Sequence, residues 1–391
     1  MLSRRKIVCK LAIIILVKFG QFIKEQPQRL GVTEYDDLRV SVTQRQNMDF
    51  KLHKDFSEID SNTWNALVEQ SIADTPFSRY EYLSEWWKTL GGGEWGVGAD
   101  GRAKPPLLVL ISASENDQLV GIAPLFIAEY ENQRTLLLIG SIEISDYLDL
   151  VVRAQDLPRF LSGLLNFLAS SHGDSWSALD WYNLPDDSPT LAALQAESES
   201  RGWTHHQEVY RPTPRIALTG SFDDYLESID KKQRHEMRRK MRRAAESGRV
   251  KFYVVDKTAD IEPELESFFH LMVQDPSKAI FLHPAMREHM TVTLRAAHAG
   301  GYLWLAFLEV DGVKAASTLC FDYKNKLWGY NSGVSFDFKD VSPGWVIMAY
   351  DIQWCCENGR YEFDFMRGDE EYKYRMGGVN RFVMRARVIK K

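Results

Sequence analysis

The chain has 391 residues, of which 45% are hydrophobic and 26% are charged, and its formal net charge is −6. This length leaves room for two domains of ordinary size, and the composition is that of a globular protein. The mild acidity excludes a global affinity for nucleic acid, so any anion-binding surface must be local. The cysteines lack CxxC spacing, which indicates free thiols in a reducing compartment, the cytoplasm; they are Cys9, Cys320, Cys355 and Cys356.

The segment 1–47 differs from the rest of the chain. Basic residues at 4–6 precede a run of seven apolar residues, 11–17. This run is too short to span a bilayer, and no small-residue cleavage site follows it. We expect a dispensable extension or a mis-called start, with Met48 opening the globular part. An amphipathic anchor at the inner face of the membrane is the alternative.

The part 48–210 is predicted to be an α/β domain. Capping residues, prolines and closing glycines indicate helices at 63–70, 79–90, 156–170 and 191–201. Alternating or continuous apolar residues indicate strands at 107–112, 119–130, 136–139, 147–152 and 178–182. The first two of these strands are joined by the acidic turn 115–117. Together they form a predicted hairpin.

The part 211–391 repeats this order of elements. Helices are expected at 222–247, 261–274, 284–299 and 343–357. Strands are expected at 249–255, 302–310, 313–323, 326–332 and 361–366. In both halves a hairpin with a tight acidic turn precedes a strand, a helix and a closing strand. This indicates an internal duplication of an α/β unit of about 150 residues, joined near 202–221.

The helix expected at 222–247 carries the densest local charge. Eight lysines and arginines lie within the thirteen residues 231–243, and Arg234, Arg238 and Arg242 stack at i, i+4 spacing. So dense a run predicts affinity for phosphates, for an anionic lipid head group or for acidic helices of the other domain. No aromatic side chains interleave with it, so nucleic acid is not favoured as a partner.

The stretch 326–366 combines a strand, a polar loop, a helix that begins at Ser342-Pro343-Gly344, and a second strand. Free amides and the positive end of the helix dipole make such a helix start suitable for an anion. Ser342 and Gly344 are therefore candidates to bind the phosphate of a donor. The alternative is an ordinary helix start with proline at its first position.

Three motifs stand out in the second half: the basic run 231–243, Ser342-Pro343-Gly344, and Phe363–Gly368 followed by Tyr372-Lys373. The segments 76–78, 121–125 and 145–147 accompany them in the first half. Together they resemble the CelD/BcsL-type acetyltransferases of the GNAT superfamily, relatives of the FemAB-type peptidoglycan aminoacyltransferases, over 50–387.

This resemblance implies an α/β (α+β) fold of two tandem GNAT-like domains, 48–210 and 211–391, with mixed sheets flanked by helices. It also implies transfer of an acyl group from a thioester such as acyl-CoA. The usual GNAT pyrophosphate loop, Arg/Gln-x-x-Gly-x-Gly/Ala, is absent, and Ser342-Pro343-Gly344 occupies its place with one glycine.

The resemblance also assigns roles to single residues. Lys373 would stabilise the developing oxyanion, as the equivalent lysine is thought to do in FemAB-type enzymes; the alternative is a surface lysine after an acidic turn. Asp364 shares a strand face with Glu362 and would accept the proton of the acceptor amine. The alternative there is a solvated sheet face, with Asp364 fixing a neighbouring loop.

Further candidates surround these two. Tyr330 and Asn331 lie where the thioester of a GNAT donor would rest, with ordinary strand packing as the alternative. Acceptor binding is expected from Arg234, Arg238 and Tyr372. The histidines lack paired ligand spacing, and no GxSxG element, dinucleotide fingerprint or Walker loop is present, so no metal and no permanently bound cofactor are expected.

The sequence thus predicts an N-acyltransferase that moves an acyl group from acyl-CoA, acetyl-CoA in the simplest case, to an amine. The acceptor would be a small molecule or a glycan or lipid precursor related to the cell envelope or to polysaccharide. The alternative is a non-catalytic GNAT-fold protein that binds an anionic polymer or membrane through its basic helix. The acyl chain, the oligomeric state and the choice among CoA, acyl carrier protein and aminoacyl-tRNA are left open.

Overall fold

The computed structural model describes residues 48–92, 105–130, 133–172 and 175–390. These residues belong to one compact unit. The predicted N-terminal extension, 1–47, lies outside the described residues. Among the described residues, no helix is long and apolar enough to cross a bilayer.

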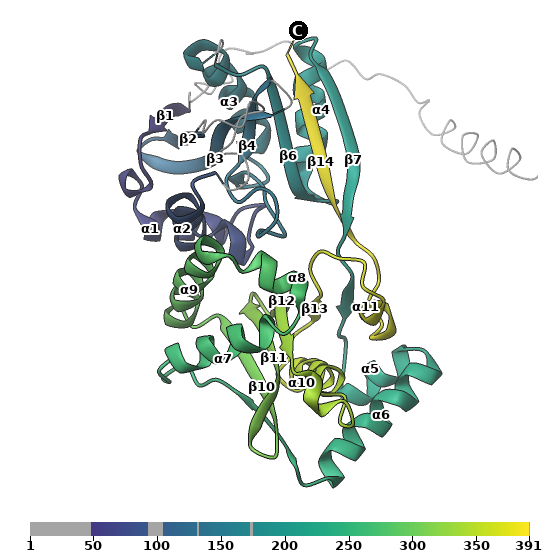
Figure 1. The fold of residues 1–391 in the computed structure, drawn as a ribbon. Helices are drawn as coiled ribbons and strands as arrows, with labels where there is room; N and C mark the ends of the chain where they lie inside the picture. The colour runs from purple at the N-terminus through teal and green to yellow at the C-terminus, as the bar shows by residue number, and fades with distance from the viewer. Residues whose placement is uncertain (1–47, 93–104, 131–132, 173–174, 391) are drawn as a thin grey trace, which may run out of the picture. The chain divides into compact units, whose positions relative to one another are not determined.

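The first sheet runs in the order β1-β2-β3-β4-β6-β14-β7, and β5 pairs with β3 beside this path (Figure 1). Its strands are β1 (Asp49–His53), β2 (Leu107–Glu115), β3 (Gln118–Tyr130), β4 (Gln133–Leu138), β5 (Val151–Val152), β6 (Ala178–Pro185), β7 (Thr204–Pro212) and β14 (Phe382–Ile389). The second sheet runs in the order β8-β13-β12-β11-β10-β9. Its strands are β8 (Arg215–Ala217), β9 (Val250–Val254), β10 (Leu303–Val310), β11 (Val313–Tyr323), β12 (Lys326–Val334) and β13 (Glu362–Asp364).

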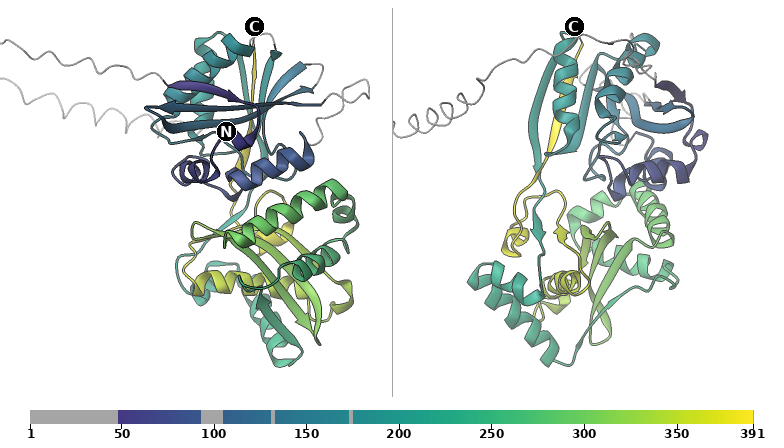
Figure 2. Two further views of the ribbon diagram at one scale, coloured as in Figure 1. Left: turned by 90° about the vertical axis from the view of Figure 1, so that its left-hand side faces the viewer. Right: turned by 180° about the vertical axis from the view of Figure 1, so that it is seen from behind.

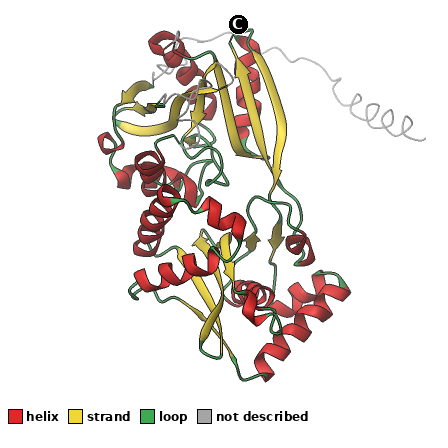
Figure 3. Cartoon of the chain, viewed as in Figure 1, coloured by secondary structure: helices red, strands yellow, loops and turns green. Residues whose placement is uncertain are grey.

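Helices flank both sheets (Figure 3). They are α1 (Ser61–Val68), α2 (Tyr80–Leu90), α3 (Leu157–His172), α4 (Pro189–Ser200), α5 (Phe222–Ser228), α6 (Lys231–Glu246), α7 (Glu262–Met272), α8 (Pro276–Phe281), α9 (Pro284–Ala299), α10 (Pro343–Glu357) and α11 (Glu371–Arg375). Helix α10 packs against β11, β12 and α6, and α7 packs against β11 and β12. Helices α2 and α9 lie side by side although they belong to different halves of the chain (Figure 2).

The two sheets share one topology. In each, an edge strand (β1 or β9) pairs antiparallel with a hairpin (β2–β3 or β10–β11), and a further antiparallel strand (β4 or β12) follows. A helix (α3 or α10) then connects to a parallel strand (β6 or β13), which has an antiparallel neighbour (β14 or β8). The prediction of two tandem GNAT-like units with mixed sheets is therefore confirmed.

The last strand of the chain, β14, returns to the first sheet and inserts between β6 and β7. Strand β8 holds the equivalent place beside β13 in the second sheet. The first sheet is therefore completed by the last strand of the chain, whereas β8 precedes all other strands of the second sheet. A domain boundary at residue 210 stays a prediction, with the added finding that residues 382–389 pair with the first sheet.

The single helix predicted at 222–247 is wrong, because the chain forms α5 and α6 there. Ile229 is extended, with φ −90° and ψ 163°, which ends α5. The side chain of Asp230 then accepts hydrogen bonds from the backbone N–H groups of Lys232 and Gln233 and opens α6. A capping aspartate inside an apparently continuous helical pattern thus restarts the helix in a new direction.

Candidate functional site

The parallel strands β12 and β13 stay paired for only three residues, Lys326–Trp328 against Glu362–Asp364. Strand β12 then continues to Val334 without that neighbour. On its other side, Asn331 pairs with Leu319 and Gly329 with Cys320, so Tyr330 is the extra residue of a β-bulge. Separation of the strands and the bulge both open space at the same point, because a bulge redirects the strand and its side chains.

A cavity of about 360 Å³, which we call the polar cavity, lies at this opening. Five segments contribute its lining: the loop 143–146, the end of β7, helix α8, strand β12 and the turn 367–368. Its lining residues are Glu143, Ile144, Asp146, Tyr210, Arg211, Ser277, Lys278, Phe281, Tyr330, Asn331, Arg367 and Gly368. The predicted site residues Tyr330 and Asn331 thus lie in this wall.

Two cations of the polar cavity, Lys278 and Arg211, form no ion pair with a carboxylate of the described residues. The half-buried Lys278 donates from Nζ to the backbone oxygen of Ser332 at 2.6 Å and to its Oγ at 3.3 Å. Burial lowers the pKa of the Lys278 amine, against the attraction of nearby acidic groups. Arg211 lies over the ring of Tyr210, 4.9 Å from its centroid. The cavity therefore offers an anion two partners that are not already neutralised.

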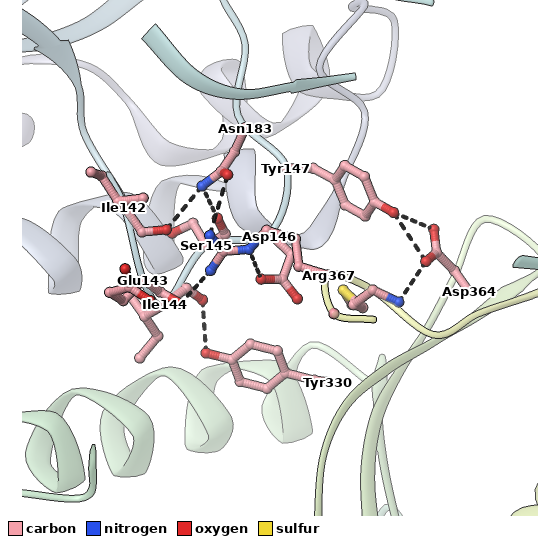
Figure 4. Close-up of polar contacts among 12 residues, drawn as sticks. Ile142, Glu143, Ile144, Ser145, Asp146, Tyr147, Asn183, Tyr330, Asp364 and Arg367 are labelled. Carbon is pink, nitrogen blue, oxygen red and sulfur yellow. Dashed lines mark hydrogen bonds and ion pairs between the residues drawn. The ribbon is translucent and has the colours of Figure 1, made fainter. Parts of the chain in front are cut away.

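Asp364 lies at the point where β13 ends and is fully buried. The hydroxyl of Tyr147 donates to both of its carboxylate oxygens, and the backbone N–H of Met366 donates to Oδ1 at 2.7 Å (Figure 4). Arg215 completes the surroundings with Nε at 3.1 Å from Oδ2. Burial raises the pKa of Asp364 to about 6, although the charge of Arg215 opposes the rise. The predicted alternative of a solvated sheet face is wrong; the carboxylate fixes the adjoining turn.

Lys373 is also buried, with 2% of its surface exposed, so it is not a surface lysine. Its Nζ donates to the backbone oxygens of Arg367 at 2.8 Å and Met366 at 3.3 Å, and it pairs with Glu370 at 2.9 Å. Met366 has φ +57°, which is uncommon for a residue with a side chain, and Gly368 has φ +129°, a conformation that glycine tolerates. The amine therefore donates to several carbonyl groups of the turn 366–368. Lys373 itself is not one of the residues that line the polar cavity.

Arg367 ties this turn to the loop 143–146 of the first half. Its Nε donates to Asp146 at 2.6 Å, and its other nitrogens donate to the side chain of Asn183 and to the backbone oxygen of Glu143 (Figure 4). The hydroxyl of Tyr330 donates to the backbone oxygen of Ile144 at 3.0 Å. Both ends of the cavity wall are therefore fixed to the same loop.

The start of α10 lies apart from the polar cavity, because neither Ser342 nor Gly344 lines it. Ser342 has φ +56° and its side chain caps no amide, while its backbone oxygen accepts from the N–H of Trp345 at 3.0 Å. A Cβ on Gly344 would lie 3.0 Å from the side chain of Val334. The structure thus does not bring the predicted phosphate-binding residues together with Tyr330 and Asn331.

The predicted acceptor-binding residues lie elsewhere too. Arg234 pairs with Glu227, and Arg238 pairs with Asp223 at 3.3 Å, so carboxylates of α5 meet both cations. Tyr372 packs edge-on against Phe365, with 39% of its surface exposed. None of these residues lines the polar cavity.

Sequence reasoning missed Glu143, Arg211 and Lys278. Arg211 lies in the Arg-Pro-Thr-Pro segment that was interpreted as a break between halves. Lys278 lies in α8, a helix of six residues that periodicity did not reveal. A proline after an aspartate, Asp275-Pro276, was the available signal for that helix.

Within the described residues, no cluster of histidine, cysteine, aspartate and glutamate could hold a metal ion. The two sheets of shared topology and the opening between β12 and β13 are those of a tandem GNAT fold. Residues 231–374 match the model of the acetyltransferase (GNAT) domain. No curated protein matches the chain in sequence.

Solved structures share this fold over most of the chain. The crystal structure of FemX matches with 13% identity and a TM-score of 0.61, over 86% of this chain and 97% of that one. L-PGS from Bacillus licheniformis matches with 13% identity and a TM-score of 0.50, over 84% and 91%. A conserved protein of unknown function from Bacteroides thetaiotaomicron matches with 11% identity and a TM-score of 0.54, over 88% and 100%.

The chain therefore has a tandem GNAT fold similar to that of FemX, and its residues 231–374 match the acetyltransferase (GNAT) domain. The finer resemblance to CelD/BcsL-type enzymes stays a prediction.

Proposed function

We propose that the protein transfers an acyl group from a thioester, acyl-CoA in the first instance, to an amine of a cell-envelope or polysaccharide-related acceptor. The observation that supports this best is the polar cavity at the opening between β12 and β13. A thioester entering between separated strands can present its carbonyl to donors of the protein while an amine approaches from the other side.

In the proposed reaction, the acceptor nitrogen attacks the acyl carbon and forms the C–N bond. The C–S bond then breaks, the sulfur leaves as a thiolate, and a proton from the nitrogen passes through water to the sulfur. The products are an amide and a free thiol. Asn331 is the residue that we assign to the acyl carbonyl. Its Oδ1 accepts from the backbone N–H of Ser332 at 2.8 Å, which leaves Nδ2 to donate into the cavity.

Lys373 and Asp364, both predicted to be catalytic, are assigned positioning roles in this proposal. Both are buried behind the turn 366–368, and their polar contacts go to that turn and its neighbours. They hold Arg367 and Gly368 in the cavity wall. The start of α10, with Ser342 and Gly344, remains the proposed contact of the donor's anionic part, since its side-chain cap is missing.

The test is release of free thiol by the purified chain from acetyl-CoA and longer acyl-CoA thioesters, with a panel of amines. Acyl carrier protein and aminoacyl-tRNA, the donors that the sequence leaves open, also belong in the panel, with amide formation followed by mass spectrometry. We expect Asn331→Ala to lower kcat by about 100-fold, the usual effect of losing one oxyanion donor. Lys257→Ala, at an exposed lysine that does not line the cavity, is the control. Failure of every donor would refute the proposal.

A further inference from the structure

A second cavity of about 410 Å³ adjoins the polar cavity, and we call it the apolar cavity. Most of its lining side chains are apolar. They are Trp86, Thr89, Leu90, Ser141, Glu143, Ile144, Phe281, His283, Ala285 and Met286. Glu143, Ile144 and Phe281 line both cavities, so the two spaces share a wall. One ligand can therefore reach into both.

Glu143 is the acidic residue of this shared wall. Its side chain is exposed and forms no ion pair with a cation of the described residues, while its backbone oxygen accepts from Arg367. Asp146, the other carboxylate of the polar cavity, is occupied by Arg367. The carboxylate of Glu143 is thus available to a cationic group at the junction of the two cavities.

Helix α8 places two different groups at the same junction. Lys278 and Phe281 are three residues apart, so they lie on one face of the helix. The amine of Lys278 lines the polar cavity only, whereas Phe281 belongs to the shared wall. Arg211, from the end of β7, adds a second cation on the polar side. An anion on the polar side, a cation at the junction and an apolar group beyond it would all find partners.

We propose that the two cavities also take a free α-amino acid with a large apolar side chain as an acceptor, in addition to the cell-envelope or polysaccharide-related amine. Its carboxylate binds Lys278 and Arg211, its ammonium group binds Glu143, and its side chain enters the apolar cavity. This inference rests on the acyl transfer of the proposed function and adds a second class of acceptor to it. A carboxylate, an ammonium group and an apolar side chain on one carbon atom match the three kinds of partner around the shared wall.

The step balances in atoms and protons. The ammonium group gives one proton to Glu143, and the resulting amine attacks the acyl carbon of the thioester. The C–N bond forms, the C–S bond breaks, and the second proton of the nitrogen reaches the departing sulfur through water. Glu143, being exposed, returns its proton to the solvent. The product is an N-acyl amino acid.

The experiment measures binding without a donor, by calorimetry and by tryptophan fluorescence, because Trp86 lines the apolar cavity. The ligands are phenylalanine, phenylalaninamide, 3-phenylpropionate and glycine. We expect phenylalanine to bind at least tenfold more tightly than each of the others, since each lacks one of the three groups. Equal binding of phenylalanine and its amide would overturn the assignment, as would no binding of phenylalanine at all.

Variants separate the three contacts. Lys278→Met and Arg211→Met should each weaken the binding of phenylalanine at least tenfold and leave the binding of phenylalaninamide unchanged. Glu143→Gln should weaken the binding of phenylalanine and leave the binding of 3-phenylpropionate unchanged. Ala285→Phe should fill the apolar cavity and therefore weaken the binding of phenylalanine but not that of glycine. Lys257→Met is the control. An equal effect of the first two variants on phenylalanine and its amide would contradict a carboxylate site.

The two proposals fail in different ways. Binding of phenylalanine with these variant effects, but no thiol release from any donor, would refute the transferase and leave the amino-acid site standing. Transfer to other amines without phenylalanine binding would refute the amino-acid site and leave the transferase standing.

Discussion

The hydroxyl of Tyr147 donates to both carboxylate oxygens of Asp364, at 3.0 and 2.9 Å, although the residues lie 217 positions apart. Tyr147 follows the loop that carries Glu143, and Asp364 ends β13 just before the turn 366–368. The bond therefore joins the segments that carry two parts of the cavity lining, the loop 143–146 and the turn 367–368. Because both groups are buried, no water competes for it.

Tyr147→Phe removes this donor and leaves part of a buried carboxylate without a partner. We expect the free energy of unfolding to fall by about 1–3 kcal/mol at pH 8, measured by urea denaturation. The loss should be smaller below pH 6, because burial raises the pKa of Asp364 to about 6 and the protonated carboxyl needs the donor less. Tyr361→Phe, at a side chain 51% exposed, should change stability by less than about 0.5 kcal/mol. Equal losses in the two variants would contradict this account.

Asp351 gives the chain a pH dependence of its own. It is fully buried in α10, Trp304 donates to its Oδ1 at 3.3 Å, and burial raises its pKa to about 7. The folded state therefore binds a proton that the unfolded state releases between about pH 4 and 7. Stability from this group must fall as the pH rises through that window, by at most about 1.4 kcal/mol per pH unit.

Asp351→Asn removes this titration. We expect the wild type to lose stability relative to the variant between pH 4.5 and 7, when urea unfolding of both is compared at each pH. The comparison cancels the titration of all other groups. A difference that stays constant with pH, or that changes in the opposite direction, would show that Asp351 is not protonated in the folded state.

The two lysines near the cavity should respond differently to the same substitution. Lys373→Met leaves the carbonyls of Met366 and Arg367 without their donor, so it should lower the free energy of unfolding by about 1–3 kcal/mol. Lys278→Met removes a half-buried amine whose partners lie in a single residue, Ser332. It should cost less than about 1 kcal/mol.

Transfer kinetics complete the comparison. Lys278→Met should raise KM for the acceptor with little effect on folding. The effect of Lys373→Met on activity should be relieved in part by a stabilising osmolyte, as expected for a positioning residue. A Lys373→Met protein of normal stability but without activity would instead assign the lysine to the chemistry.

The sequence predicted local elements well where their signals are local. Helix α10 begins at Pro343 and ends at Glu357, as the proline and the apolar run indicated. The hairpin between the strands predicted at 302–310 and 313–323 also forms, with Asp311 and Gly312 in its turn at φ 53° and 80°. Such signals need no knowledge of the rest of the chain.

Elements that depend on distant partners were not predictable in this way. Strand β14 pairs with β6, which lies about two hundred positions earlier in the chain. The sequence pattern within 382–389 does not indicate which strand β14 pairs with. The strand predicted at 147–152 is reduced to Val151–Val152. Asp149 in that segment is buried and accepts hydrogen bonds from Ser188 and Thr190, which lie about forty positions further along the chain. The polar cavity could not be predicted from the sequence for the same reason, because its lining residues come from five separate segments of the chain.

Gly368 tests whether the turn behind the cavity needs its unusual backbone. Its φ is +129°, and a Cβ there would lie 2.2 Å from Oε2 of Glu370 and 2.8 Å from Nζ of Lys373. Gly368→Ala should therefore displace the lysine amine from the turn and lower the free energy of unfolding by about 2–3 kcal/mol. Gly359→Ala is the matched control, since Gly359 has φ +69° with no atom near its Cβ position. It should cost only about 1 kcal/mol. Because Gly368 lines the polar cavity, its variant should also weaken binding of phenylalanine, whereas Gly359→Ala should not. Equal costs, or unchanged binding in Gly368→Ala, would show that the turn does not shape the cavity.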